Sequence, residues 1–133
     1  MAPGRSIYLP WPPGDLSPNS RVDRRKSTSS RRAYRFSAFA LAKAERLPIE
    51  ARSRLVLTFC PPDRRHRDLD NMLASIKVGL DGIAEASGCD DSEWSLTLER
   101  GEPVKGGAVI VRVADPWRSI GEISRKMVEG AVT

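Results

Sequence analysis

Apolar residues recur along this chain with two different spacings, which predict a mixture of strands and helices. Residues 53–60 (SRLVLTFC) are rich in apolar and β-branched side chains, and residues 94–101 and 107–115 alternate between apolar and polar positions. Both patterns are typical of β-strands. A short strand pattern also opens residues 6–21, where several prolines then end it and predict a shaped loop.

Two further segments show the 3.6-residue spacing of amphipathic helices. In 70–88 the apolar positions form one stripe with charged residues opposite, and Gly88 suits the end of a helix. In 31–47 the spacing is less regular, and Pro48 ends the pattern. The polar, cationic segment 22–32 that precedes this helix is expected to be a mobile basic loop.

The order of these elements predicts an α+β protein. Strand, loop, helix, strand, helix and two strands follow one another, which favours a small mixed β-sheet with helices packed on it. The 133 residues suit a single domain, which we assign to residues 1–115. Residues 116–133 carry apolar positions at helical spacing, so we expect a C-terminal helical tail there.

The formal net charge of +5 is unevenly distributed, and this changes the functional picture. Residues 1–60 hold 12 Lys/Arg against 4 Asp/Glu, a net charge of +8, whereas residues 61–100 hold 5 against 9, a net charge of −4. A basic half before an acidic middle suits a cationic surface that binds a polyanion around an acidic metal pocket. A solvated basic arm explains the same composition.

Cysteine and histidine are too few to predict a zinc site. Cys60 and Cys89 form no Cys-x-x-Cys pair, and His66 is the sole histidine. Two thiols of this kind suit a reducing compartment. No apolar run approaches about 18 residues and no apolar signal segment opens the chain. We therefore expect a cytoplasmic protein without a membrane span.

Three aspartates near the second predicted helix are the candidate chemistry. Asp68 and Asp70 stand where strand 53–60 gives way to that helix, and Asp91 follows it. If the chain turns back along the helix, strand 94–100 carries Asp91 toward the first pair. Carboxylates without histidine or cysteine are typical ligands of Mg²⁺, which activates a water and stabilises a leaving oxygen in phosphoryl chemistry.

Purely structural roles explain the same aspartates. Asp68 suits the N-cap of the helix, and Asp70 suits the positive end of the helix dipole. Asp90 and Asp91 suit a turn. The Asp-x-Asp spacing alone does not separate these roles from metal binding.

A run of basic residues stands directly before the first aspartate pair. Arg64, Arg65 and Arg67 flank His66, and the phosphates of a nucleic acid are their natural partner if a metal neutralises the aspartates. A solvated basic loop is the alternative. We interpret His66 as a cation-like neighbour rather than a general base.

Four segments together resemble the RusA family of Holliday junction resolvases, found in bacteria, prophages and phages. LPWPP (9–13) is similar to the opening of that family, and PDRRHRDLDN (62–71) to its central motif. LDGIAEASGCDDSEW (80–94) resembles its Asp-Asp segment, and PVKGGAVIVRV (103–113) its closing hairpin strand. The resemblance runs from about residue 6 to 114, with the motifs in the family's order.

This resemblance implies a homodimeric, Mg²⁺-dependent endonuclease that cuts four-way branched DNA by paired symmetrical incisions. Each cut leaves a 5′-phosphate and a 3′-hydroxyl, Mn²⁺ is an alternative metal, and no small-molecule substrate is involved. The metal-binding and catalytic role falls to Asp68, Asp70 and Asp91, while Asn71 and Asp90 support them. Two coordinated cuts on a two-fold symmetric junction suit a C₂ dimer.

One position departs from the family pattern. In the best-known member an essential lysine follows the motif asparagine by three residues, and Ala74 stands at that place here. Lys77 lies three residues further on, which at about 100° per residue keeps it on the helix face of Asp70. We expect Lys77 to take the catalytic role of the missing lysine. The alternative is a simple i,i+4 pair with Asp81.

The remaining cations of the N-terminal half are the other expected DNA contacts. They are Arg21, Arg24, Arg25, Lys26, Arg31 and Arg32. The main interpretation is a junction resolvase that acts in recombination, repair or phage DNA processing. A less selective nuclease for flap or branched DNA and a non-catalytic protein that binds branched DNA are the two alternatives.

Overall fold

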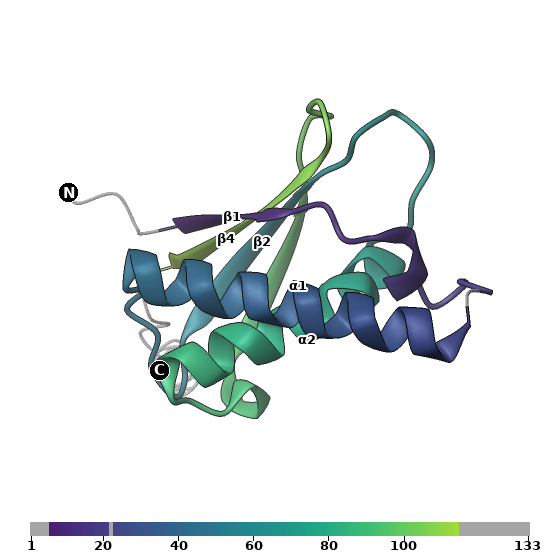
Figure 1. Ribbon diagram of the computed structural model, residues 1–133. Helices are drawn as coiled ribbons and strands as arrows, with labels where there is room; N and C mark the ends of the chain where they lie inside the picture. The colour runs from purple at the N-terminus through teal and green to yellow at the C-terminus, as the bar shows by residue number, and fades with distance from the viewer. Residues whose placement is uncertain (1–5, 22, 115–133) are drawn as a thin grey trace, which may run out of the picture.

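The computed structural model describes residues 6–21 and 23–114, and its elements follow the predicted order (Figure 1). The helices and strands are β1 (Ser6–Pro10), α1 (Arg24–Glu45), β2 (Arg54–Cys60), α2 (Leu69–Ser87), β3 (Ser95–Arg100) and β4 (Ala108–Ala114), with 3₁₀ turns η1 (Gly14–Leu16) and η2 (Asp91–Glu93). The α+β class with a small mixed sheet in one domain is confirmed. The tail predicted at 116–133 lies outside the described residues.

The sheet has its four strands in the order β1-β4-β2-β3. β4 pairs antiparallel with both β1 and β2, whereas β2 and β3 are parallel. A parallel pair needs a crossover connection, and α2 supplies it by running back from the end of β2 toward the start of β3 (Figure 1). The crossover brings η2 and the start of β3 back to the C-terminal half of α2.

β3 and β4 do not form the closing hairpin that the resemblance implies, because β2 lies between them. β2 is buried on both faces, and such a strand belongs inside a sheet rather than at its edge. The connection from β3 to β4 therefore passes the end of β2. It is bonded there by Gly101 N to Phe59 O (2.8 Å) and Val104 N to Pro61 O (2.9 Å).

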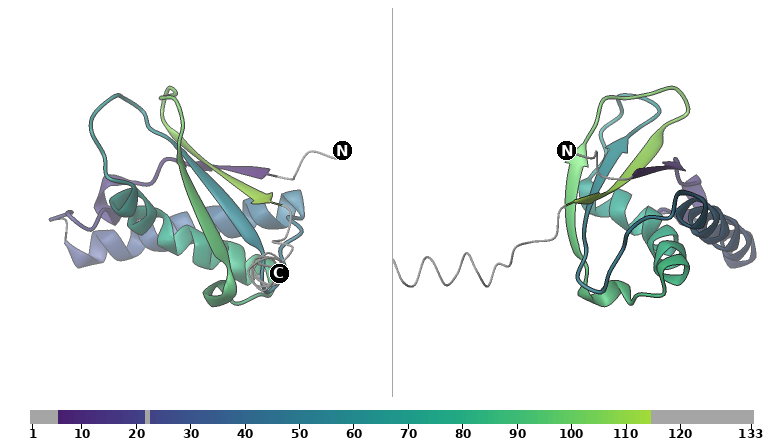
Figure 2. Two further views of the ribbon diagram at one scale, coloured as in Figure 1. Left: turned by 180° about the vertical axis from the view of Figure 1, so that it is seen from behind. Right: turned by 90° about the vertical axis from the view of Figure 1, so that its left-hand side faces the viewer.

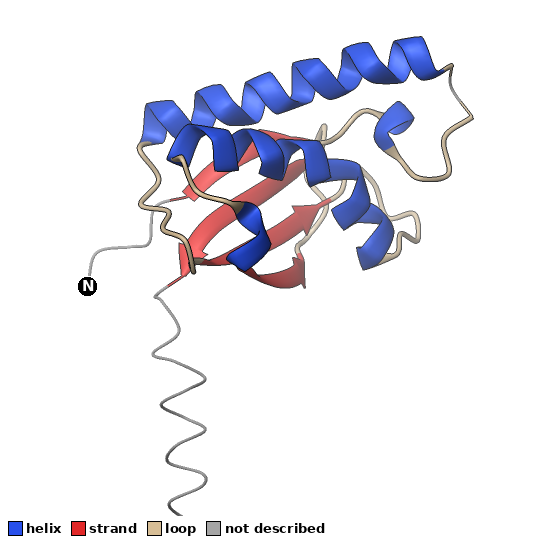
Figure 3. Cartoon of the chain, turned by 90° about the horizontal axis from the view of Figure 1, so that it is seen from below, coloured by secondary structure: helices blue, strands red, loops and turns tan. Residues whose placement is uncertain are grey.

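Both helices cover the same face of the sheet, and the core lies between the two layers (Figures 2 and 3). The fully buried side chains of this core include Leu55, Leu57, Phe59, Ile76, Leu80, Ile83, Val109 and Val111. Burying a side chain of this size contributes about 1.5–3 kcal/mol. Within the described part of the chain, no helix combines the length and apolar character needed to cross a membrane.

The two helices approach each other very closely at Gly82. A Cβ atom at this position would lie 2.3 Å from the carbonyl oxygen of Arg35 and 3.1 Å from the amide nitrogen of Phe39. On the facing helix, Ala38 and Ala42 are buried. Small residues on both helices therefore allow backbone-to-backbone contact, which fixes α1 against α2.

The prediction of a mobile loop at 22–32 is wrong for the residues that the structure describes there. α1 begins at Arg24, seven residues before the predicted start, and its first turns project past α2 (Figures 1 and 3). The carboxylate of Asp23 caps the helix by accepting from Arg25 N (3.2 Å). The hydroxyl of Ser30 donates to the carboxylate of Asp15 (2.5 Å). A cap and a tie to η1 thus hold these turns in helical form, although the side chains that the structure describes at 25–32 are exposed or only partly buried.

Candidate active site

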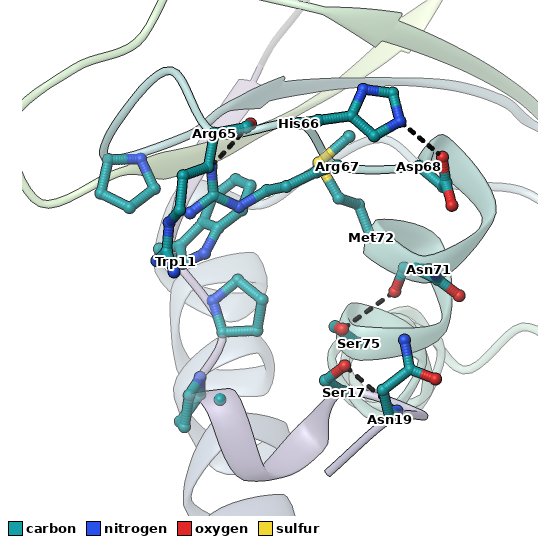
Figure 4. Close-up of a pocket in the computed structure, with 14 residues that line it drawn as sticks. Trp11, Ser17, Asn19, Arg65, His66, Arg67, Asp68, Asn71, Met72 and Ser75 are labelled. Carbon is teal, nitrogen blue, oxygen red and sulfur yellow. Dashed lines mark hydrogen bonds and ion pairs between the residues drawn. The ribbon is translucent and has the colours of Figure 1, made fainter.

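A cleft of about 550 Å³ opens between the connection after β1, the connection after β2 and the first turns of α2 (Figure 4). Prolines shape both connections because they fix φ and remove backbone donors. Apolar walls come from Trp11, Pro12, Pro13, Pro62 and Met72, and polar groups come from Ser17, Asn19, Arg65, His66, Arg67, Asp68, Asn71 and Ser75. The segments 9–13 and 62–71, which carry much of the family resemblance, therefore meet across one cleft.

Asp68 occupies the N-cap position of α2, but its side chain does not cap the helix. The backbone of Asp68 is extended (φ −83°, ψ 139°), and its carboxylate makes no capping hydrogen bond. The carboxylate instead lies 3.1 Å from Nε2 of His66 (Figure 4). Asn71, one turn further on, also lines the cleft. The predicted capping role therefore does not account for the Asp68 carboxylate.

Asp70 stands in the first turn of α2, where a negative charge is favourable to the helix dipole. Its side chain is exposed and is not among the residues that line the cleft. It forms no hydrogen bond or ion pair with the residues that the structure describes. A carboxylate in this state is accessible to a cation from solvent.

Asp91 returns to α2, as the predicted turn of the chain requires, but it meets Lys77 rather than the first aspartate pair. The ammonium of Lys77 donates to Oδ2 of Asp91 (2.5 Å) and to Oδ1 of Asp81 (3.0 Å). Partial burial lowers the pKa of Lys77, but these two hydrogen bonds raise it by more, so the net pKa is raised. The hydrogen bond from Lys77 in turn lowers the pKa of Asp91.

The three predicted metal ligands do not form a ready-made metal site. Among residues 6–21 and 23–114, no group of three or more Asp, Glu, His or Cys side chains is close enough to hold a metal ion. Asp70 and Lys77 are seven residues apart on one helix, or about 10.5 Å along its axis. Mg²⁺ is commonly bound by one or two carboxylates together with substrate phosphates. The donors Asp68 and Asp70 fit that simpler arrangement.

Asp90 takes the turn role that suits its place in the sequence. Its carboxylate accepts from Ser92 N (2.9 Å) and caps η2. This cap fixes the turn that carries Asp91 to α2. A support role for Asp90 is therefore structural: it holds the chain that positions Asp91.

The arginines of the central motif pair with carboxylates of the protein itself. Asp63 receives Arg65 Nε (3.3 Å) and Arg67 Nη1 (2.8 Å), while Arg64 lies 3.8 Å from Glu102. The hydrogen bond from Arg67, together with the backbone amide of Arg65, holds the pKa of Asp63 well below its usual range. The exposed pairs Arg65–Asp63 and Arg64–Glu102 contribute little stability, because water screens them. Asp63 was absent from the predicted site, although Asp-Arg-Arg before a helix is compatible with the Asx turn that it makes.

The cations on the projecting turns of α1 are different. Arg25, Lys26, Arg31 and Arg32 are all exposed, and none of them forms an ion pair with a described residue. Arg31 donates to the hydroxyl of Ser27 (3.2 Å). The structure therefore presents exposed cations around the projecting turns of α1.

No protein-family model matches this sequence. A relative from Xylella fastidiosa (strain Temecula1 / ATCC 700964), described as an uncharacterized protein, is 39% identical over 115 residues, which covers 82% of this chain and 75% of the relative. The chain belongs to the same family as this protein. The name of this relative gives no activity, so membership of its family assigns none.

The helix α2 carries two separate groups of charged side chains. One end of α2 offers an exposed carboxylate pair beside a concave surface, and its third turn offers an ammonium group between two further carboxylates. The sequence spacing identified Lys77 and Asp91 separately but not their contact. Asp81 was considered only as the i,i+4 partner of Lys77, and the structure adds Asp91 as a second partner.

Proposed function

We propose that this protein is a Mg²⁺-dependent, structure-selective DNA endonuclease that resolves four-way junctions. The observation that best supports the proposal is the cleft in which residues 9–13 and 62–71 meet, because both segments resemble the RusA family and both line one concave surface with Asp68 and Asn71. The proposed place of action is the cytoplasm, in recombination, repair or phage DNA processing.

The charge distribution supports DNA as the substrate. Residues 21–35 hold seven Lys/Arg and one Asp, a net charge of +6, on and beside the projecting turns of α1. Phosphate contacts from such a surface supply affinity that depends on salt but little on sequence. The basic helix is therefore expected to supply affinity rather than sequence preference.

In this proposal Asp68 and Asp70 hold the metal together with phosphate oxygens of the bound strand. The metal would supply activation of a water and stabilisation of the leaving oxygen. Asn71 orients Asp68 or a water from its place in the cleft. Lys77 keeps its ammonium charge beside the scissile strand, and Asp91 can act as a metal ligand only if its pair with Lys77 opens.

Paired incisions add one requirement. One chain offers one cleft, so two symmetrical cuts need two copies that face the two-fold axis of the junction. A homodimer with an isologous interface meets this requirement. The proposal therefore includes a C₂ dimer.

The test is cleavage of a synthetic mobile four-way junction beside linear duplex and flap DNA. Wild type is assayed with Mg²⁺, Mn²⁺ or EDTA, next to Asp70→Asn and the matched control Asp90→Asn, in which an asparagine oxygen keeps the cap of η2. We expect symmetrical cuts on the junction with either metal and none with EDTA. Asp70→Asn should lose cleavage by at least about 100-fold and keep binding, whereas the control should keep both.

Two other outcomes would replace the proposal. Equal cutting of flap and junction substrates would indicate a less selective branch nuclease. Binding that is the same with Mg²⁺ and EDTA, without any cutting by wild type, would indicate a non-catalytic protein that binds branched DNA. In that case Ala74→Lys is the substitution to try first, because it restores the lysine at the position where the resemblance expects it.

A further inference from the structure

Arg67 differs from the other arginines of the central motif in its exposure. The side chains of Arg64 and Arg65 are 82% and 81% exposed, as phosphate-binding side chains on a surface would be. The side chain of Arg67 is only 18% exposed. The same short connection therefore contains two arginines directed to solvent and one directed into the protein.

The guanidinium of Arg67 ties its own connection together. Its Nη1 atom donates to the Asp63 carboxylate at 2.8 Å, to the Asp63 carbonyl oxygen at 3.4 Å and to the Arg65 carbonyl oxygen at 3.3 Å. The backbone carbonyl of Arg67 in turn accepts from Arg100 Nη1 at the end of β3 (2.8 Å). Both ends of this residue are thus fixed by neighbours within the fold.

The same guanidinium lies over the ring of Trp11, 5.5 Å from the ring centre (Figure 4). The backbone at Gly107 also packs against Trp11, because a Cβ atom there would lie 2.8 Å from Cβ of Trp11 and 3.0 Å from Cδ of Pro62. Arg67 and Trp11 therefore form one packed layer in the wall of the cleft. This layer joins the connection after β1 to the connection after β2.

Arg67 has less access to a phosphate than its neighbours, because its side chain is only 18% exposed and its Nη1 donors are used within the connection. Moving its guanidinium out of this layer would break the hydrogen bond that holds the pKa of Asp63 low and would give up the stack on Trp11. Arg64 and Arg65 would have to break only exposed ion pairs, which are worth little. The exposed arginines are therefore much better placed to meet DNA.

We propose that Arg67 is a positioning residue that joins the Trp11 layer to the connection between β2 and α2, and so directs Asp68 and Asn71 toward the cleft. It takes this role in place of the phosphate contact that the sequence suggests. The inference rests on the proposed function, since DNA cleavage is the reaction being positioned. Its structural part concerns the free protein and can be tested without DNA.

The chemistry of the contact explains why arginine is required. A planar guanidinium can stack on an indole ring and donate in its own plane at the same time, whereas a lysine ammonium is a point charge that cannot stack. For a phosphate contact, lysine is a good substitute. The substitution Arg67→Lys therefore separates the two roles, because it keeps the charge and removes the plane.

The experiment compares Arg67→Lys and Arg67→Met with Arg64→Met, which removes the same charge from the exposed part of the same connection. In the free protein, the indole N–H resonance of Trp11 is followed by NMR and assigned with Trp11→Phe. With junction DNA, the salt dependence of the dissociation constant is measured. With Mg²⁺, kcat and KM are measured separately.

We expect both Arg67 variants to move the Trp11 resonance and to lower kcat by roughly 10–100-fold, since small misplacements at a reacting centre have effects of this size. KM and the salt slope should stay near wild type, and Arg67→Lys should not restore kcat. Arg64→Met should leave the Trp11 resonance unchanged and act on binding instead, raising KM and reducing the salt slope by up to about 0.9.

The opposite pattern would overturn the inference. If Arg67→Met reduces the salt slope by about 0.9, leaves the Trp11 resonance in place and is rescued by Arg67→Lys, Arg67 is a phosphate ligand. If wild type neither binds nor cuts junctions, the proposed function fails. In that case the Trp11 resonance still tests the structural part. An unchanged resonance in both Arg67 variants would refute the contact between Arg67 and Trp11, and a shifted resonance would support it.

Discussion

Two arginine-rich segments of this protein have similar appearance in the sequence and opposite electrostatics in the fold. Residues 21–35 carry seven Lys/Arg and one Asp, whereas residues 61–71 carry three Arg and three Asp, so their net charges are +6 and zero. In the second segment the cations are matched by carboxylates of the protein, chiefly Asp63 and Glu102. In the first segment Arg35 pairs with Glu85 (3.0 Å). The exposed cations of the projecting turns, Arg25, Lys26, Arg31 and Arg32, have no such partners among the described residues.

The difference shows that a high density of arginine does not by itself identify a phosphate-binding surface. A paired arginine must exchange a protein carboxylate for a phosphate, so the net gain of binding is small. An unpaired arginine exchanges only water and counterions. The motif that resembles the RusA family is therefore the better candidate for chemistry, and the α1 surface is the better candidate for affinity.

The helix itself adds to this contrast. Cations near the N-terminus of a helix oppose the helix dipole, and the first turn of α1 contains no acidic residue. The projecting turns thus carry charges in an unfavourable place, with only Asp23 and Asp15 to offset them. A bound polyanion would relieve this repulsion among the cations and between the cations and the helix dipole.

The largest expected effect comes from removing the unpaired cations. The combined substitution Arg25→Gln, Lys26→Gln, Arg31→Gln and Arg32→Gln should weaken junction binding at least 100-fold at about 0.1 M salt. It should also lower the salt slope by up to about 3.6, because each lost phosphate contact accounts for about 0.9. Fluorescence anisotropy at several salt concentrations measures both quantities.

The matched control for that experiment is the pair Arg64→Gln and Arg65→Gln in the paired segment. We expect a change in slope below about 1.8 for these two residues, since each already has a carboxylate partner. A larger change in salt slope from this pair than from the four α1 residues would contradict the proposed difference between the two segments. It would mean that the motif arginines, and not α1, provide the DNA-binding surface.

The next effect in size concerns how the basic surface is held to the rest of the protein. Gly82→Ala should lower the free energy of unfolding by about 2–3 kcal/mol and Tm by roughly 10 °C, because its Cβ would lie 2.3 Å from the Arg35 carbonyl oxygen. Gly14→Ala is the control, since a Cβ there meets nothing within 4 Å. Equal Tm values for the two variants would show that α1 and α2 can separate at little cost.

Most of the fold could be predicted from the sequence because strand and helix periodicities are local. β2 and α2 begin and end within about one residue of the predicted 53–60 and 70–88, since the run of apolar and β-branched residues and the 3.6-residue stripe are unambiguous there. The order of the strands could not be predicted, because pairing depends on which strand is buried on both faces. For the same reason the implied hairpin was wrong.

The start of α1 and the arrangement of the candidate site needed the structure for different reasons. Residues 24–30 have no apolar stripe, so nothing local indicated a helix. The helical form of these residues depends instead on the hydrogen bond from Ser30 to Asp15 and on the packed part of α1 that follows them. Asp91 and Lys77 are 14 residues apart, and only the crossover brings them together. Helical spacing placed Lys77 on the face of Asp70 but contained no information on which carboxylate it would bind.

The smallest effect is a pH dependence at the residue where the projecting part of α1 ends. Tyr34 is buried, and its hydroxyl donates to the carbonyl oxygen of Pro10 (2.7 Å), directly before Trp11. Burial raises the pKa of this hydroxyl far above its ordinary value. An unfolded tyrosine ionises near pH 10. The contribution of Tyr34 to stability is therefore complete below about pH 10 and is lost as the pH rises further, because only the unfolded chain then releases the proton.

Tyr34→Phe should therefore be less stable than wild type by about 1 kcal/mol at pH 8, through loss of the hydrogen bond. Wild type should lose about 1.4 kcal/mol more than the variant between pH 9 and pH 11, so that the two become nearly equal. Urea unfolding at pH 8, 9, 10 and 11 measures the difference, with the exposed Tyr8 common to both proteins. A difference that stays constant with pH would mean that Tyr34 ionises as readily in the folded protein. The hydrogen bond from Tyr34 to Pro10 would then not anchor the projecting part of α1 to the wall of the cleft.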